Sequence, residues 1–309
     1  MSDLSVQLGS LVLKNPILMA AGTFGYGLEF QEFFDLEFLG GVITKTLTLK
    51  PREGNPAPRV VETPSGMLNA VGLQNIGVDA FLKEKWPGLS ALKAPIIVSI
   101  AGFSENEFVE IARRLEGVPA AAIELNLSCP NVSHLPAGRQ GASSIRCFAQ
   151  SAEETQSVVS QVKKIVGVPV FAKLSPEVSD IASIAKAAAD GGADVLTLIN
   201  TMAGMVIEVE QEIPVLANKT GGLSGPAIRP IAVRCIWEAH QAVKTPILGL
   251  GGVASGRDAL ELILAGASAV AVGTANFWNP RAPKIILEEL TALVRNKNRP
   301  VRDLIGAVH

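Results

Sequence analysis

An asparagine, a thiol and a proline follow an apolar segment near the middle of the chain. Residues 121–126 read AAIELN and lead directly into Leu127-Ser128-Cys129-Pro130. The proline disfavours helical backbone at Cys129, which predicts an extended or turn conformation there. A loop thiol beside Asn126 can act as a base or a nucleophile, although most free cysteines are small buried hydrophobic groups. Cys129 is therefore the first candidate for a catalytic residue.

Polar side chains also follow other apolar segments, at Lys45, Thr46, Ser99, Lys173, Asn200 and Thr201. A lysine is rare at the end of an apolar strand, because a buried ammonium group needs partners. Two of them, Lys45 and Lys173, indicate an anionic ligand, while the alternative for each is a side chain that reaches the rim and binds nothing. Taken together, two lysines, two asparagines and a thiol favour one shared site.

Glycines follow two further apolar segments. Gly251-Gly252 and Gly273-Thr274 would expose backbone amides that suit a phosphate. Residues 249–254 (GLGGVA) also fit the pattern G-x-G-x-x-G/A, but no acidic residue ends the next strand, at 268–272. The sequence therefore favours a mononucleotide phosphate over a nicotinamide dinucleotide, with glycines that serve only tight turns as the alternative.

The segments that must position these residues alternate between strand and helix patterns. Eight short apolar segments predict strands, at 16–20, 41–45, 95–100, 121–126, 168–174, 193–198, 246–250 and 268–272. Amphipathic segments between them predict helices, at 104–116, 151–166, 179–190, 227–243 and 256–265. Eight such units over about 250 residues predict an α/β fold, a (β/α)8 TIM barrel, with a doubly wound open sheet as the alternative.

The remaining segments complete the expected architecture. Residues 4–13 alternate around Gly9-Ser10 and predict an N-terminal hairpin at the bottom of the barrel. The long segments 46–78 and 201–225 lack helical periodicity and predict inserted loops on the C-terminal face. Because no internal repeat or linker is evident, we expect residues 1–309 to form a single domain.

Composition excludes several classes of protein. A net charge of -2 and a pI near 6.0 predict no binding to nucleic acid or to an anionic membrane. The N-terminus lacks the pattern of a signal peptide, and no apolar run approaches the ~20 residues of a membrane span. Three scattered cysteines and three histidines predict no metal site and suit a reducing compartment, so we expect a cytoplasmic protein.

Long motifs throughout the chain resemble those of the dihydroorotate dehydrogenases, which are flavin enzymes of pyrimidine (UMP) biosynthesis. The motifs are 15-NPILMAAGTFGYG-27, 44-TKTLT-48, 63-TPSGMLNAVGLQN-75, 124-ELNLSCPN-131, 172-AKLSP-176, 197-TLINT-201, 220-TGGLSGPAI-228 and 270-VAVGTANF-277. The runs NAVGLQN and GGLSGPAI are most similar to the catalytic subunit of the class 1B type, which passes electrons to a partner subunit.

The resemblance implies a role for each matching residue. FMN would contact Ala21, Lys45, Thr46, Ser99, Asn126, Lys173, Ile199, Gly225, Gly251, Gly252, Gly273 and Thr274. The substrate would contact Lys45, Asn69, Ala70, Val71, Gly72, Leu73, Asn126, Asn200 and Thr201. Cys129 would be the base that removes the C5 proton of dihydroorotate, and Lys173 would stabilise the reduced flavin.

The resemblance also implies the reaction and its partners. We expect oxidation of dihydroorotate to orotate by hydride transfer to FMN, in a homodimer that passes electrons to NAD. The FAD and the iron–sulfur cluster would lie on an electron-transfer subunit, giving a heterotetramer. Three alternatives stay open: a class 1A-like homodimer that uses fumarate, a Schiff-base aldolase acting through Lys173, and an inactive barrel that serves as a scaffold.

Two features depart from the family pattern. Ser99 stands where the family usually has asparagine, and its shorter side chain would need a water to reach the flavin. Residues 132–146 form a longer loop than usual after the catalytic motif, where the family has a loop that covers the substrate.

Overall fold

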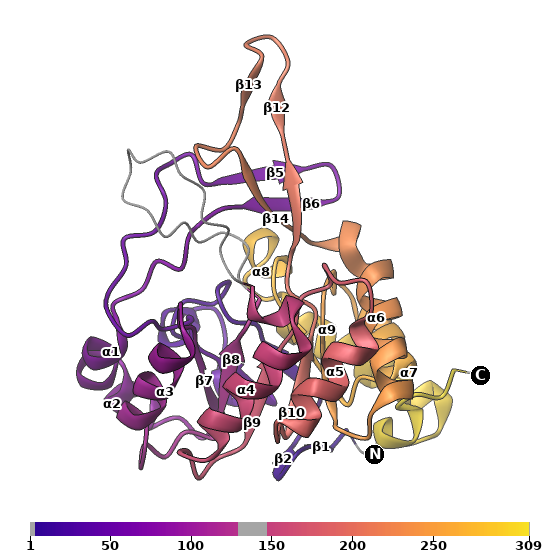
Figure 1. Cartoon of the computed structure of the whole chain (residues 1–309). Coiled ribbons are helices and arrows are strands. Elements are labelled where there is room, and N and C mark those ends of the chain that lie inside the picture. Colours follow the sequence, from indigo (N-terminus) through magenta and orange to yellow (C-terminus); the bar gives the residue numbers. More distant parts are fainter. Residues whose placement is uncertain (1–3, 129–146, 309) are drawn as a thin grey trace.

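A closed barrel of eight parallel strands forms the centre of the protein. The computed structural model describes residues 4–128 and 147–308, and the strands follow the order β10-β15-β16-β3-β4-β7-β8-β9 around the barrel (Figure 1). The barrel strands are β3 (Ile17–Met19), β4 (Gly41–Ile43), β7 (Ile96–Ile100), β8 (Ala122–Asn126), β9 (Val170–Lys173), β10 (Val195–Leu198), β15 (Ile247–Leu250) and β16 (Ala269–Val272). Each of the eight predicted strands contains one of them. The predicted barrel is thereby confirmed, and the open sheet is excluded.

Helices surround the barrel. They are α1 (Val78–Glu84), α2 (Trp86–Leu89), α3 (Glu105–Arg114), α4 (Ala152–Lys163), α5 (Ile181–Asp190), α6 (Arg229–Ala242), α7 (Gly256–Ala265), α8 (Ala275–Trp278) and α9 (Ala282–Lys297). The five predicted helices correspond to α3 through α7. Four of these begin at a side chain that accepts a hydrogen bond from the backbone of the first turn, namely Ser104, Ser151, Asp180 and Ser255. These N-caps explain why the helices begin where they do.

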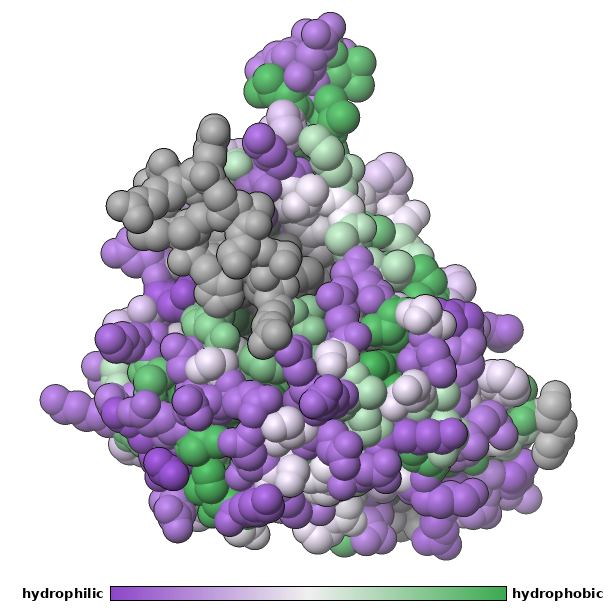
Figure 2. Space-filling model, viewed as in Figure 1, coloured by the Kyte–Doolittle hydropathy of each residue, from purple (hydrophilic) through white to green (hydrophobic). Residues whose placement is uncertain are grey.

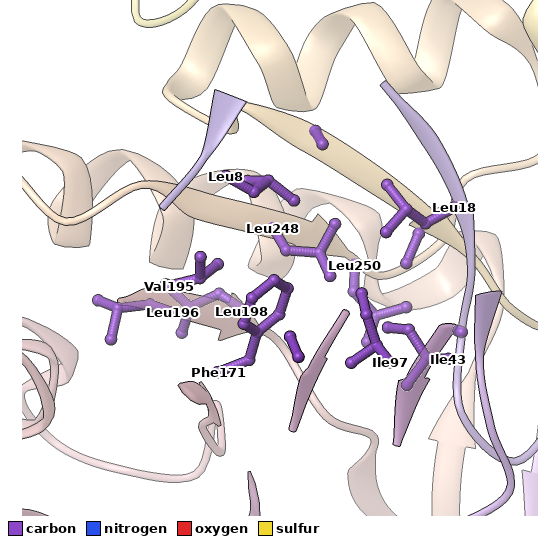
Figure 3. Close-up of a cluster of buried hydrophobic side chains, with 14 of the residues drawn as sticks. Leu8, Leu18, Ile43, Ile97, Phe171, Val195, Leu196, Leu198, Leu248 and Leu250 are labelled. Carbon is purple, nitrogen blue, oxygen red and sulfur yellow. The ribbon is translucent and has the colours of Figure 1, made fainter. Parts of the chain in front are cut away.

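Aliphatic and aromatic side chains fill the interior of the barrel below the site. Leu18, Ile43, Ile97 and Phe171 are among the fully buried residues that gather there (Figure 3). Leu8 belongs to the same cluster, although it comes from the N-terminal hairpin of β1 (Val6–Leu8) and β2 (Leu11–Leu13). The predicted hairpin is therefore present, and it packs against the barrel core.

The two long inserts pair with each other to form an antiparallel sheet, in the order β11-β14-β6-β5. Its strands are β5 (Val60–Thr63), β6 (Gly66–Asn69), β11 (Met202–Met205) and β14 (Thr220–Ser224). The hairpin of β12 (Ile207–Glu208) and β13 (Ile213–Pro214) projects beyond this sheet (Figure 1). The inserts were expected as loops, so their strands are a correction: short, partly exposed and glycine-containing segments pair here with partners far away in sequence.

The projecting hairpin carries apolar side chains on its surface. Figure 2 shows hydrophobic surface on the projecting hairpin, where Ile207, Val209 and Ile213 are exposed.

Within residues 4–128 and 147–308, no helix combines the length and the apolar character that a membrane crossing requires. The same residues hold no group of three His, Cys, Asp or Glu side chains suited to a metal ion.

Candidate active site

A cavity lies at the C-terminal ends of the barrel strands, below the antiparallel sheet. Of the residues assigned to FMN by resemblance, the cavity is lined by Ala21, Lys45, Thr46, Asn126, Lys173, Ile199, Gly225, Gly251, Gly252, Gly273 and Thr274. Of those assigned to the substrate, it is lined by Lys45, Asn69, Val71, Gly72, Leu73, Asn126, Asn200 and Thr201. Residues that lie more than two hundred positions apart in sequence, such as Ala21 and Thr274, thus share one cavity, as a barrel fold requires.

Two of the assigned residues do not line the cavity. Ser99 is fully buried behind Thr46, and its hydroxyl lies 3.0 Å from the Thr46 hydroxyl. Ala70 is fully buried in the inserted sheet, where its backbone N–H donates to the Arg59 carbonyl oxygen over 2.8 Å. Any effect of these two residues on a ligand must pass through their neighbours.

Cys129 and the long loop at 132–146 lie outside the described residues. The chain that leads to Cys129 is held by Asn200, which follows β10. The Asn200 amide donates to the carbonyl oxygen and to the hydroxyl of Ser128, over 2.9 Å in each case, and to Asn126 Oδ1 over 3.3 Å. The Asn200 side-chain oxygen accepts from the Thr201 backbone N–H. The two asparagines therefore link β8 to β10 immediately before the thiol.

Lys173, at the end of β9, places a positive charge on the wall of the cavity. The residue is only 5% exposed, and within the described part of the chain its ammonium group has no hydrogen-bond or ion-pair partner. A buried ammonium group without a partner is costly, so a protein retains one where a ligand supplies the partner. Lys173 therefore fits an anionic ligand or a ligand that becomes anionic.

The glycine loop after β15 lies close to the start of α6. Gly252 has a φ of 74°, and a Cβ atom there would lie 2.7 Å from the Arg229 Cβ and 2.9 Å from the Gly225 carbonyl oxygen. A Cβ at Gly251, where φ is 134°, would lie 2.8 Å from the Ala232 Cβ. Both the backbone conformation and the close approach require glycine. The loop can thus present bare backbone to the cavity, as a phosphate site does.

An ion-pair cluster contacts this loop, and it was not predicted from the sequence. Arg229 on α6 contacts Asp258 on α7 over 2.7 Å and Glu261 over 3.0 Å. The second carboxylate oxygen of Asp258 accepts from the Ala254 backbone N–H over 3.0 Å. The cluster joins two helices to the glycine loop, so it can determine where the loop amides lie.

Several other cavity residues were not predicted as site residues. Met67 and Ser224 come from the inserted sheet, and Phe277 and Trp278 come from α8. Ser224 accepts a hydrogen bond from the Thr274 hydroxyl over 2.8 Å, which joins the sheet to the loop after β16. The participation of Met67 and Ser224 depends on how the inserts pair, which the sequence pattern did not reveal.

Comparisons with known proteins indicate one family. Residues 3–294 match the model of a protein family described as "Dihydroorotate dehydrogenase". A protein of Citrifermentans bemidjiense is 50% identical over 308 residues, covering 99% of this chain and 98% of the relative. One of Desulforudis audaxviator is 50% identical over 307 residues (99% and 97%), and one of Geobacter sulfurreducens is 49% identical over 308 residues (99% and 98%).

All three relatives are named "Dihydroorotate dehydrogenase B (NAD(+)), catalytic subunit". The chain belongs to the dihydroorotate dehydrogenase family, a family of oxidoreductases.

Proposed function

We propose that this chain is a catalytic subunit that oxidises dihydroorotate to orotate in pyrimidine biosynthesis, with FMN in the cavity at the top of a single barrel domain formed by residues 1–309. The observation that carries the proposal is the cavity itself. It gathers the lysines, the asparagines and the glycine loops that the family motifs assign to the flavin and the substrate. The names of the relatives support the same reaction.

The residues of the cavity fit FMN. The glycine loops after β15 and β16 offer backbone amides to a phosphate, and Lys173 offers an unpartnered positive charge. The FMN-binding residues we propose are those assigned above, with Ser99 acting through Thr46 rather than by contact. When bound, FMN supplies the acceptor for the hydride that leaves C6 of the substrate.

The chain's own residues would orient the substrate and move its proton. Cys129 would accept the proton from C5 as the hydride leaves C6, so that a double bond forms between these two carbons. Asn126 and Asn200 have amide groups that match the donor and acceptor edges of a pyrimidine. Lys45 lines the same cavity and would offset the negative charge of the substrate carboxylate.

The electrons must then leave the chain. Three cysteines cannot supply the four thiolates of an iron–sulfur cluster. We propose a second subunit that carries FAD and the cluster and passes electrons to NAD, docked on a cytoplasmic homodimer of this chain. The words "NAD(+)" and "catalytic subunit" in the relatives' names support this over a fumarate-using homodimer.

The proposal is tested by the rate at which dihydroorotate reduces the bound flavin. A Cys129→Ala variant should bind FMN but reduce it at least about 100-fold more slowly, which is typical of a lost general base. Cys147→Ala is the matched control, because Cys147 is half-buried and its thiol lies 3.6 Å from the Leu127 carbonyl oxygen. Equal rates in both variants would contradict the assignment of Cys129.

The electron acceptor is tested separately by steady-state assays. The purified chain should turn over poorly with NAD or fumarate alone, and co-expression with its electron-transfer subunit should restore turnover with NAD. Full turnover of the isolated chain with fumarate would favour the class 1A-like alternative.

A further inference from the structure

Three buried oxygen-bearing side chains form a chain of hydrogen bonds beneath the cavity. The Thr46 hydroxyl lies 3.0 Å from the Ser99 hydroxyl, and the Ser99 hydroxyl donates to Glu124 Oε1 over 3.1 Å. Thr46 lines the cavity, whereas Ser99 and Glu124 have no exposed surface. The three residues come from the neighbouring strands β4, β7 and β8 or the residues just beyond them.

The direction of this chain follows from counting hydrogens. A serine hydroxyl has one hydrogen and can donate once. The Ser99 hydrogen goes to Glu124 Oε1, so the bond between Ser99 and Thr46 must use the hydrogen of Thr46. Thr46 then has no hydrogen left for the cavity. Its oxygen can offer only lone pairs to a ligand, so it acts there as an acceptor.

We propose that Glu124 and Ser99 are positioning residues that fix Thr46 as a hydrogen-bond acceptor towards FMN, so that the site favours the reduced flavin over the oxidised one. This inference rests on the proposed binding of FMN in this cavity. A buried carboxyl group thus acts on the cofactor through two hydroxyl groups, without touching the cofactor itself.

The position of Thr46 in the barrel indicates which part of the flavin it meets. Its hydroxyl reaches Ser99 on β7. The barrel has eight strands, and β7 is the fourth strand from β15 around it, after β16, β3 and β4. The hydroxyl is therefore across the barrel from the glycine loop proposed to hold the phosphate. In FMN the phosphate chain leaves the ring at N10, and N5 lies across the central ring from N10.

N5 changes its hydrogen-bonding character on reduction. Oxidised flavin has a lone pair at N5, which an acceptor such as Thr46 would repel, while reduced flavin has an N–H at N5, which Thr46 would bind. A hydroxyl that is free to rotate could serve both states, because it can donate or accept. The bond to Ser99 removes that freedom, so Thr46 binds the reduced flavin more favourably than the oxidised flavin.

The test is the midpoint potential of bound FMN, together with the dissociation constants of oxidised and reduced FMN. Glu124→Met removes the acceptor for Ser99, and Ser99→Ala removes the acceptor for Thr46, so each variant frees the Thr46 hydroxyl. Each should lower the preference for reduced FMN by about tenfold, the effect of one hydrogen bond. A tenfold change corresponds to about 30 mV for a two-electron couple.

We call the hydrogen-bonded series Glu124, Ser99 and Thr46 the relay. Two further variants separate the effect of this relay from a direct effect of the Glu124 charge. Glu124→Gln removes the charge but keeps a side-chain oxygen that can accept from Ser99. The preference for reduced over oxidised FMN should therefore stay within about twofold of that of the unaltered chain. Thr46→Val should lower the preference as much as Glu124→Met does. In the Thr46→Val background, Glu124→Met should then cause no further change in the preference for reduced FMN.

Some outcomes would overturn the relay. An unchanged potential in both Ser99→Ala and Glu124→Met would do so, and because the two substitutions are independent, misfolding of one leaves the other as a test. A shift from Glu124→Met that persists in the Thr46→Val background would show a direct effect instead. If the unaltered chain failed to bind FMN, the proposed function would fall, whereas normal FMN binding with unchanged potentials would refute the relay alone.

Discussion

Arg229 on α6 forms an ion pair with Asp258 on α7 over 2.7 Å, and Asp258 also holds the Ala254 backbone N–H of the glycine loop. Asp258 is largely buried, so this pair is screened less than one on the open surface. The pair thus joins two helices to the loop proposed to bind the FMN phosphate, although neither side chain was predicted as part of the site.

Arg229→Ala should weaken FMN binding by about tenfold, because the loop amides would no longer be held in place and Asp258 would lose its partner. Arg234→Ala is the matched control, since Arg234 lies on the same helix but pairs with Glu238 at the surface. Titration of the apo-protein with FMN, followed by quenching of flavin fluorescence, measures both. An equal effect of the two substitutions would contradict a role for the cluster.

Gly252→Ala should abolish tight FMN binding, with a dissociation constant raised at least about tenfold. The added Cβ would lie 2.7 Å from Arg229 and 2.9 Å from the Gly225 carbonyl oxygen, so the loop must move. Gly117→Ala is the control: its φ is 76°, close to the 74° of Gly252, but no described atom lies within 4 Å of its Cβ position. Both variants carry a strain of about 1–2 kcal/mol, and the control should keep its affinity for FMN. Loss of FMN from both would show that backbone strain alone is responsible.

Lys173→Met should have opposite effects on stability and on binding. Removal of a buried charge without a partner should raise the melting temperature of the apo-protein by roughly 2–4 °C, the shift expected for about 1 kcal/mol. The same change should weaken FMN binding by about tenfold, because a positive charge is lost from the cavity. Thermal melts with and without FMN measure both effects, and the exposed Lys186 provides the control Lys186→Met. A lower melting temperature for apo Lys173→Met would contradict the interpretation.

Asn200→Ala should slow flavin reduction by dihydroorotate by at least about tenfold while FMN stays bound. The substitution removes the donor to both oxygen atoms of Ser128, the residue before Cys129. Asn218→Ala serves as the control, because the Asn218 amide donates to the Thr220 carbonyl oxygen at an exposed position. Rapid mixing without oxygen gives the rates, and an unchanged rate in Asn200→Ala would remove this residue from the active site.

The barrel was predictable because its strands are short apolar segments, and because four of the helices between them have their own start signals. Ser104 and Ser255, for example, cap the helices that follow β7 and β15, and both signals are local in sequence. The inserted sheet was not predictable in this way. Its strands β6 and β14 pair Leu68 with Leu223, and neither strand carries a distinct periodic pattern.

The site was predictable to the extent that its functional side chains lie at the ends of barrel strands. Lys173 and Asn126 line the cavity, as expected from their places at the ends of β9 and β8. Ser99 lies near the end of β7, but its hydroxyl is hydrogen-bonded to Glu124 and Thr46 and does not line the cavity. Such a relay depends on contacts between neighbouring strands, so a single sequence does not reveal it.

The most direct test of the proposed function is an anaerobic titration of the FMN-loaded chain with dihydroorotate. One equivalent of dihydroorotate should remove the yellow absorbance of one equivalent of FMN and produce one equivalent of orotate. Dithionite added to a separate sample shows the full extent of reduction. A flavin that dithionite reduces but dihydroorotate leaves oxidised, with no orotate formed, would contradict the proposed function.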